Sequence, residues 1–132
     1  MNEDKDISAM TIEELEDEQS RVREVMDEAY KTYEMNFDLY RYASDAGNYD
    51  TADEAERTFE SAWRVYDTAK NRLEWIERLL SILSKDTEIM TIEELRDALP
   101  HTRATMEKAE AAYRAASERH KAIMDRLAAF GV

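Results

Sequence analysis

Three helix-start signals recur along the chain at an interval of 40 residues. The sequence Met-Thr-Ile-Glu-Glu-Leu occurs at 10–15 and again at 90–95, and Thr-Ala-Asp-Glu-Ala lies midway between them at 51–55. Each contains a threonine that is followed three residues later by a glutamate. In this capping-box pattern, the threonine hydroxyl and the glutamate carboxylate each accept a hydrogen bond from a backbone N–H of the first turn. We therefore expect a helix to begin at each signal.

Apolar residues follow each signal in alternating steps of three and four. The first series runs from Ile12 to Ala43, the second from Ala52 to Leu83 and the third from Ile92 to Phe130. Heptad seams of about four to five repeats are typical of long helices that pack along one stripe. The sequence therefore predicts three long helices, each with one apolar seam.

The helix ends are also marked. Gly47 stands where a left-handed residue commonly ends a helix, and the segment 84–89 interrupts the periodicity before the third signal. Connections this short make consecutive helices antiparallel. We expect one all-α domain over 1–132, an antiparallel up-down-up three-helix bundle of long coiled-coil-like helices. The expected helices are 11–46, 51–84 and 91–130, with 1–9 disordered.

Pro100 conflicts with the third helix because proline removes a backbone hydrogen bond and clashes with the carbonyl four residues earlier. We expect a kink or a break near 98–101. The favoured interpretation is a short helix followed by a longer one, with Pro100 in the first turn of the second. His101 is expected to be solvated at this point, and His120 to be a core residue on the third seam.

Composition excludes several classes of protein. The chain carries 31 acidic and 18 basic residues, a formal charge of −13, with no cysteine and two glycines. Disulfides, zinc–thiolate sites, thiol catalysis and glycine-rich phosphate loops are therefore excluded. Neither His101 nor His120 has the glutamate three residues earlier that di-metal helical bundles use. We expect no enzyme, no metal and no cofactor.

The same composition bears on location and ligands. An excess of negative charge opposes direct binding to nucleic acid. The acidic N-terminus has no apolar run, and no stretch approaches the roughly 20 apolar residues that span a bilayer. We expect a soluble cytoplasmic protein that binds neither nucleic acid nor a membrane.

The negative charge is concentrated in the first third of the chain. Residues 1–46 hold 14 acidic and 5 basic side chains, a net charge of −9, while 47–85 and 86–132 each carry −2. One interpretation is a solvated face that keeps the protein soluble. The other is an electronegative surface that attracts a basic partner, although pairs such as Asp27 with Lys31 would weaken it. The candidate acidic residues are Glu13, Glu14, Glu16, Asp17, Glu18, Glu24, Asp27 and Glu28.

Aromatic residues are concentrated in the same part of the chain. Six of the twelve lie within 30–49. Tyrosine and tryptophan supply much of the binding energy at protein interfaces, although a wide core stripe would also account for them. The candidate binding residues that a three-helix core buries least easily are Tyr30, Tyr42, Tyr49 and Trp75.

These observations favour a non-enzymatic acidic helical module that binds another protein, as an inhibitor or an adaptor. The expected partner presents a basic surface, which could itself be a nucleic-acid-binding surface. In composition and size the chain resembles the small acidic inhibitors that phages and other mobile elements use against restriction or CRISPR nucleases, some of which mimic DNA. No sequence motif carries that resemblance. The alternative is a structural coiled-coil protein that assembles with itself, for example as a homodimer.

Overall fold

The computed structural model describes residues 6–131, and within them the chain forms helices and no strand. The all-helical prediction is therefore confirmed. In chain order the elements are η2 (Ile7–Ala9), α1 (Ile12–Asp45), α2 (Tyr49–Leu83), η3 (Thr87–Ile89) and α3 (Ile92–Ala129). The chain divides into two compact units. One is Leu15–Ser81, and the other joins the residues up to Glu14 to the chain from Ile82 onward.

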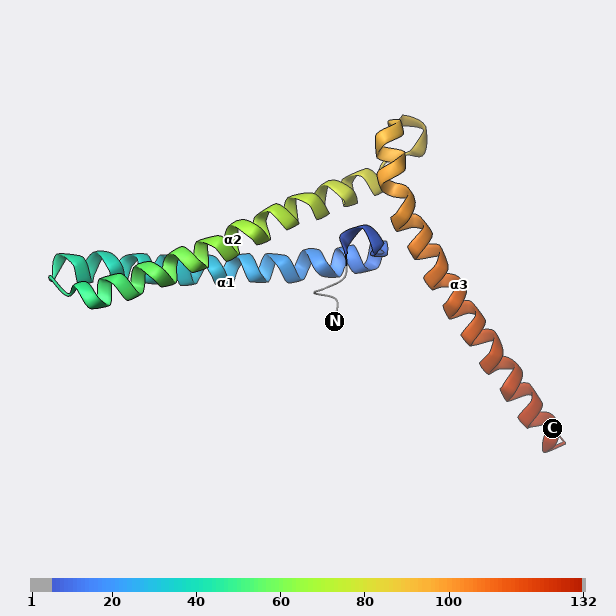
Figure 1. The fold of residues 1–132 in the computed structure, drawn as a ribbon. Helices are drawn as coiled ribbons and strands as arrows, with labels where there is room; N and C mark the ends of the chain where they lie inside the picture. The colour runs from blue at the N-terminus through green and yellow to red at the C-terminus, as the bar shows by residue number, and fades with distance from the viewer. Residues whose placement is uncertain (1–5, 132) are drawn as a thin grey trace. The chain divides into compact units, whose positions relative to one another are not determined.

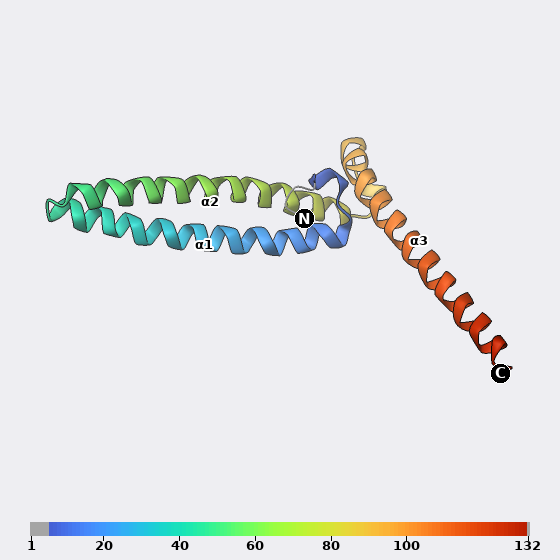
Figure 2. The same ribbon diagram turned by 60° about the horizontal axis from the view of Figure 1, so that its bottom comes forward.

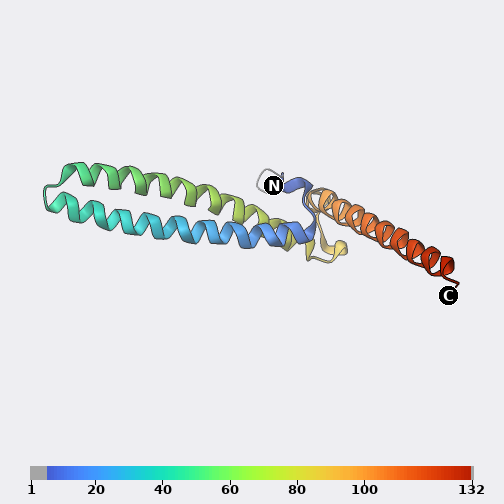
Figure 3. The ribbon, with the colours of Figure 1, turned by 90° about the horizontal axis from the view of Figure 1, so that it is seen from below.

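The first unit is an antiparallel helical hairpin. Figure 1, Figure 2 and Figure 3 all show α1 and α2 as neighbouring helices joined by one tight turn. This is the packing of neighbouring helices in a bundle, and it follows from the short connection. The buried apolar side chains of the hairpin are Leu15, Val22, Ala29 and Ala43 of α1 and Ala52, Ala55, Ala62, Ala69, Ile76 and Leu79 of α2.

The turn of the hairpin ends α1 as expected. Gly47 has a φ of 75°, the left-handed conformation that favours glycine. The N–H of Gly47 donates to the carbonyl of Ser44, and the N–H of Asn48 donates to the carbonyl of Ala43. These two bonds form a Schellman motif, which satisfies carbonyls at the end of the helix.

The expected start of the second helix is wrong by two residues. The helix begins at Tyr49, and Asn48 rather than Thr51 caps it. The side-chain oxygen of Asn48 accepts a hydrogen bond from the N–H of Thr51, at 3.4 Å. Because asparagine is one of the strongest N-cap residues and Asn48 comes immediately after Gly47, the helix begins there and not at Thr51. Thr51 lies inside the first turn of α2.

In the second unit, the two copies of Met-Thr-Ile-Glu-Glu-Leu both start helices, as predicted. The Thr91 hydroxyl accepts from the N–H of Glu94, and the Glu94 carboxylate accepts from the N–H of Thr91. Thr11 and Glu14 form the same pair of bonds at the start of α1.

Two expectations about the ends of the helices are wrong. Residues 7–9 form the 3-10 turn η2 instead of being disordered, and Ile7 is buried. Residues 1–5 of that expectation lie outside the described residues. The third helix is not broken at Pro100, because α3 is continuous from Ile92 to Ala129. The kink stays a prediction.

The seam of α3 is exposed. Its large members Met106, Tyr113, Ile123, Leu127 and Phe130 are each 44–78% exposed, and His120 is exposed too instead of lying in a core. The up-down-up arrangement of three helices and its coiled-coil geometry therefore stay predictions. In residues 6–131, no helix is both long and apolar enough to cross a membrane.

Candidate functional site

One predicted partner-binding residue, Glu18, is buried inside the hairpin. Its side chain is 2% exposed and lies between two arginines. Arg21, one turn along α1, donates to both carboxylate oxygens, and Arg72 of α2 donates from Nε at 3.0 Å. A buried carboxylate requires such paired donors, because burying an unpaired charge is costly. Glu18 therefore joins α1 to α2 and is not available at the surface.

The electrostatics of Glu18 follow from these contacts. The hydrogen bond from Arg21 lowers the pKa of the carboxyl below 4.5, against the effect of burial, and Arg72 adds to the lowering. The sequence carried a signal for this placement: Glu18 shares a helical face with Leu15 and Val22, three residues before and four after it. The alternating steps of three and four that start at Ile12 instead place Gln19 on the seam at this turn, and Gln19 is only half-buried.

Five of the predicted acidic residues form an exposed row on α1. At 100° per residue they occupy an arc of about 120° on the side of the helix away from Leu15 and Val22. None of the five forms an ion pair with any residue in the described part of the chain. In particular, Asp27 and Lys31, whose spacing would allow an ion pair, are not paired. We call this row the acidic face: Glu16, Asp17, Glu24, Asp27 and Glu28.

The two other acidic candidates have local partners. Glu14 is half-buried, and its carboxylate accepts the backbone N–H of Thr11 in the capping box. Glu13 is exposed and lies 3.7 Å from the ammonium of Lys108. Exposed pairs of this kind contribute little to stability. These two carboxylates organise the start of α1 and belong to a different part of the structure from the acidic face.

Aromatic side chains of α1 and α2 pack together in the half of the hairpin nearer the turn. Tyr33 is central, with its ring centroid 5.2 Å from that of Trp63 and 5.7 Å from that of Phe59. Tilted and edge-to-face arrangements such as these stabilise ring pairs. Rings of α1 contact rings of α2 in five pairs. We call the group the aromatic cluster: Tyr30, Tyr33, Phe37, Tyr40, Phe59, Trp63 and Tyr66.

The four aromatic candidates fall into two groups. Tyr30 belongs to the aromatic cluster, 5.7 Å from Tyr66, and the nearby Glu34 carboxylate raises the pKa of its phenol. Tyr42 and Tyr49 lie at the two helix ends that meet in the turn and are 76% and 70% exposed. Trp75 is 55% exposed on α2. Of the four candidates, the two tyrosines near the turn are the most exposed.

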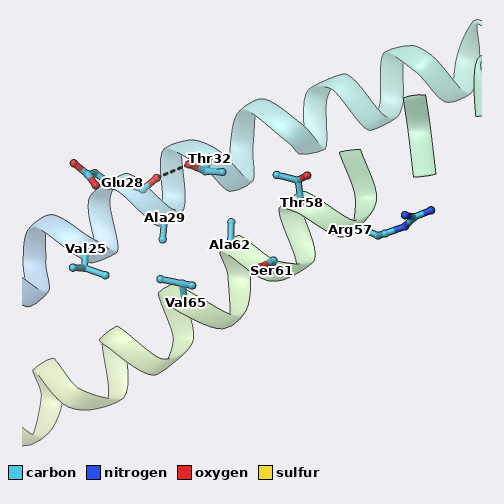
Figure 4. A pocket seen from close by; sticks show the side chains of 9 residues that line it. All are labelled: Val25, Glu28, Ala29, Thr32, Arg57, Thr58, Ser61, Ala62 and Val65. Atoms are coloured by element: carbon cyan, nitrogen blue, oxygen red, sulfur yellow. Dashed lines mark hydrogen bonds between the residues drawn. The ribbon is translucent and has the colours of Figure 1, made fainter. Parts of the chain in front are cut away.

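An open groove of about 500 Å³ lies between α1 and α2. Figure 4 shows Val25, Ala29, Ala62 and Val65 directed toward the space between the helices, while Arg57 points away. The groove exists because the two alanines are too small to fill it. Glu28, a member of the acidic face, borders it and accepts the Thr32 hydroxyl at its backbone carbonyl.

The structure places His101 differently from the sequence expectation. The side chain is 1% exposed, and its Nδ1 lies 2.9 Å from the carbonyl oxygen of Met10. Because a carbonyl only accepts, Nδ1 carries the hydrogen of this bond. The sequence did not show this contact, since it joins residues 91 positions apart. Across residues 6–131, histidines and carboxylates form no cluster of three or more that could hold a metal ion.

Together, these features describe a helical hairpin with an internally paired carboxylate, an aromatic cluster and an exposed acidic face. Comparison with known proteins finds no matching family model, no similar curated protein and no similar solved structure.

Proposed function

We propose that this protein is a non-enzymatic acidic helical module that binds a basic surface of another protein through the acidic face. It acts as an inhibitor or an adaptor. The partner surface is basic because it would pair with a row of carboxylates that form no ion pair within the described part of the chain. Such a field speeds encounter with a positively charged partner and selects against acidic ones.

The observation that carries this proposal is the contrast between Glu18 and its neighbours on α1. The chain supplies two arginines to the carboxylate that it buries, yet the five carboxylates of the acidic face form no ion pair with the described residues. Arg23 of α1 pairs with Glu77 of α2 instead. The paired carboxylate therefore holds the hairpin together, and the acidic face stays available to a partner.

The spacing of the charges favours a protein partner over close imitation of DNA. From Glu16 to Glu28 the helix rises about 18 Å, at 1.5 Å per residue. Over 18 Å, duplex DNA carries about 11 phosphate charges. The acidic face carries five carboxylates, about half that density. An ordinary basic protein surface is therefore the better match, and a nucleic-acid-binding channel is the narrower version of the same proposal.

The hairpin also presents two exposed tyrosine rings that could contact a partner. Tyr42 and Tyr49 lie where α1 and α2 meet at the turn, and both rings are largely exposed. Tyrosine rings bury a large area on binding at low conformational cost. Because the hairpin is held by the aromatic cluster and by Glu18, little ordering is required when a partner binds.

The test is capture of a partner from the native host with three full-length proteins: the wild type and two charge-reversed variants with equal net charge. The first variant carries E16K, D17K, E24K, D27K and E28K. The second, a matched control, reverses five exposed carboxylates of α2 with D53K, E54K, E60K, D67K and E74K.

We expect the first variant to lose the partner and the control to retain it. Glu14 and Glu18 are left unchanged, since they hold the structure, and circular dichroism checks that both variants keep their helical content. Equal recovery with all three proteins would exclude the acidic face as the binding surface.

One observation favours self-assembly as a second candidate function. The heptad seam of α3 is exposed at Met106, Tyr113 and Ile123, and exposed apolar stripes of this size mark association surfaces. In the predicted up-down-up bundle, this seam would instead pack against the other two helices of the same chain. Light scattering distinguishes these alternatives, because self-assembly gives a molecular mass that rises with protein concentration and packing within one chain does not.

A further inference from the structure

The chain contains two copies of one helix-start motif, which we define as residues 6–15 and 86–95. Both copies end in Met-Thr-Ile-Glu-Glu-Leu and begin with an aspartate, Asp6 or Asp86. Each aspartate caps a 3-10 turn by accepting the N–H two residues later, at 3.1 and 3.2 Å. The methionine that follows has φ and ψ of −78° and 144° in the first copy and −77° and 141° in the second. The two copies therefore fold alike.

The first copy is docked on α3. Three contacts hold it: His101 Nδ1 donates to the carbonyl of Met10 at 2.9 Å, the N–H of Ile12 donates to the Thr105 hydroxyl at 3.1 Å, and Lys108 pairs with Glu13. The turn η2 lies beside this part of α3 (Figure 2). We call the α3 residues the docking face: Ala98, His101, Thr105 and Lys108, at positions that share one side of the helix.

Every motif residue in those three contacts is repeated in the second copy. Met90, Ile92 and Glu93 stand where the first copy has Met10, Ile12 and Glu13. Two of the bonds use backbone atoms, whose positions depend only on the shared local conformation. The docking face therefore offers the second copy the same three contacts.

The two copies differ in burial. Met10 and Leu15 of the first copy are 1% and 0% exposed, whereas their counterparts in the second copy are more exposed: Met90 is half-buried and Leu95 is 41% exposed. The second copy cannot reach the docking face of its own helix. Glu93 and Lys108 are separated by 15 residues of α3, which is about 22 Å along the helix.

We propose that the docking face of α3 is a recognition site for the helix-start motif, and that the second copy in another molecule of this chain is its ligand. The first copy occupies the site within its own molecule. Because the first copy is tethered, its effective concentration at the docking face is in the millimolar range. It must leave the docking face before the second copy of another molecule can bind there. Thr87 replaces the buried Ile7, which further favours the first copy. The N-terminal segment is thus a cover over a self-association site.

Crosslinking tests this contact, because the chain has no cysteine of its own. The variant E93C/K108C is treated with a short bis-maleimide, with and without M10D, which releases the first copy. Two cysteines about 22 Å apart on one helix cannot be bridged within a chain, so any specific product joins two molecules. E13C/K108C is the positive control and gives a crosslinked monomer. E93C and K108C alone measure random crosslinking.

We expect release by M10D to raise the intermolecular product about tenfold or more over the same cysteine pair without it. Adding I92D, which places a charge in the second copy, should remove the gain. I7D is a second release variant and should act as M10D does, which guards against local unfolding at Met10. Product no higher than with single cysteines in both release backgrounds, while E13C/K108C still crosslinks, would overturn the proposal.

Discussion

Arg72 of α2 donates two hydrogen bonds to one carboxylate oxygen of Glu18, which precedes it by 54 residues on α1. With Arg21 bound to the same carboxylate, this contact fixes the register of the hairpin at the end away from its turn. The aromatic cluster holds the other half. The two helices are therefore held together by a charged contact far from the turn and by an aromatic contact nearer to it. The acidic face takes part in neither contact.

Glu18→Gln should destabilise the protein by about 1–3 kcal/mol, because two arginines would lose the charge that compensates them. Asp17→Asn is the matched control. Asp17 is the neighbouring acidic residue, is exposed and forms no ion pair within residues 6–131. Its effect should lie within about 0.5 kcal/mol. Urea denaturation of the wild type and both variants measures the difference, and equal losses would show that Glu18 is not a structural residue.

The stability of the wild type should fall in acid more steeply than that of Glu18→Gln. Arg21 and Arg72 lower the pKa of Glu18 in the folded protein, so the unfolded chain takes up the proton first as the pH falls. The stabilisation is complete above the ordinary value of 4.5 and is lost as the pH falls through the folded pKa. Lys85 lowers the pKa of Glu94 as well, so part of the dependence should persist in the variant. Melting temperatures of the wild type and of Glu18→Gln, measured as the pH is lowered from neutral to below 4.5, check the prediction.

Asn48→Ala should cost about 1 kcal/mol, and Thr51→Ala should cost less. Asn48 caps α2, whereas Thr51 lies inside the first turn. Thr91→Ala is a positive control, because Thr91 accepts the N–H of Glu94 at 3.1 Å as the cap of α3. Thermal unfolding of the three variants ranks them. A larger loss for Thr51→Ala than for Asn48→Ala would place the start of the second helix where the sequence pattern had it.

Tyr33→Ala and Tyr42→Ala should separate stability from binding. The Tyr33 ring contacts four other rings of the aromatic cluster, so its loss should cost about 2 kcal/mol or more. The Tyr42 ring is 76% exposed, so its loss should leave the melting temperature unchanged and weaken partner binding. Calorimetry and partner capture give the two readouts. A stability loss at Tyr42 would reassign that ring to the fold.

The sequence predicted local structure well and contacts between distant segments poorly. The capping boxes at Thr11 and Thr91 and the left-handed Gly47 are patterns of a few residues, and all three are confirmed. The start of α2 was wrong because two capping signals compete within four residues, and Asn48 is placed immediately after the turn. Periodicity alone does not rank such signals.

The misplaced site residues share one physical cause. From sequence alone, a charged or polar side chain is expected to be exposed unless its partner is known. Arg72, a partner of Glu18, and Met10, the partner of His101, are far away in the sequence. The helical face of Glu18 was visible, but Arg72 was not identifiable as its partner. Conversely, exposed carboxylates such as Asp17 and Glu24 were placed correctly on the surface, because no apolar residue lies on their side of α1 between Glu16 and Glu28.

The affinity of the captured partner at several salt concentrations tests directly whether the acidic face binds a basic surface. The measurement compares the wild type with the neutralised variant E16Q/D17N/E24Q/D27N/E28Q. We predict that the wild-type affinity falls steadily as salt screens the acidic face. The variant should bind more weakly at low salt and show little salt dependence. Equal affinity and equal salt dependence for the two proteins would contradict the account.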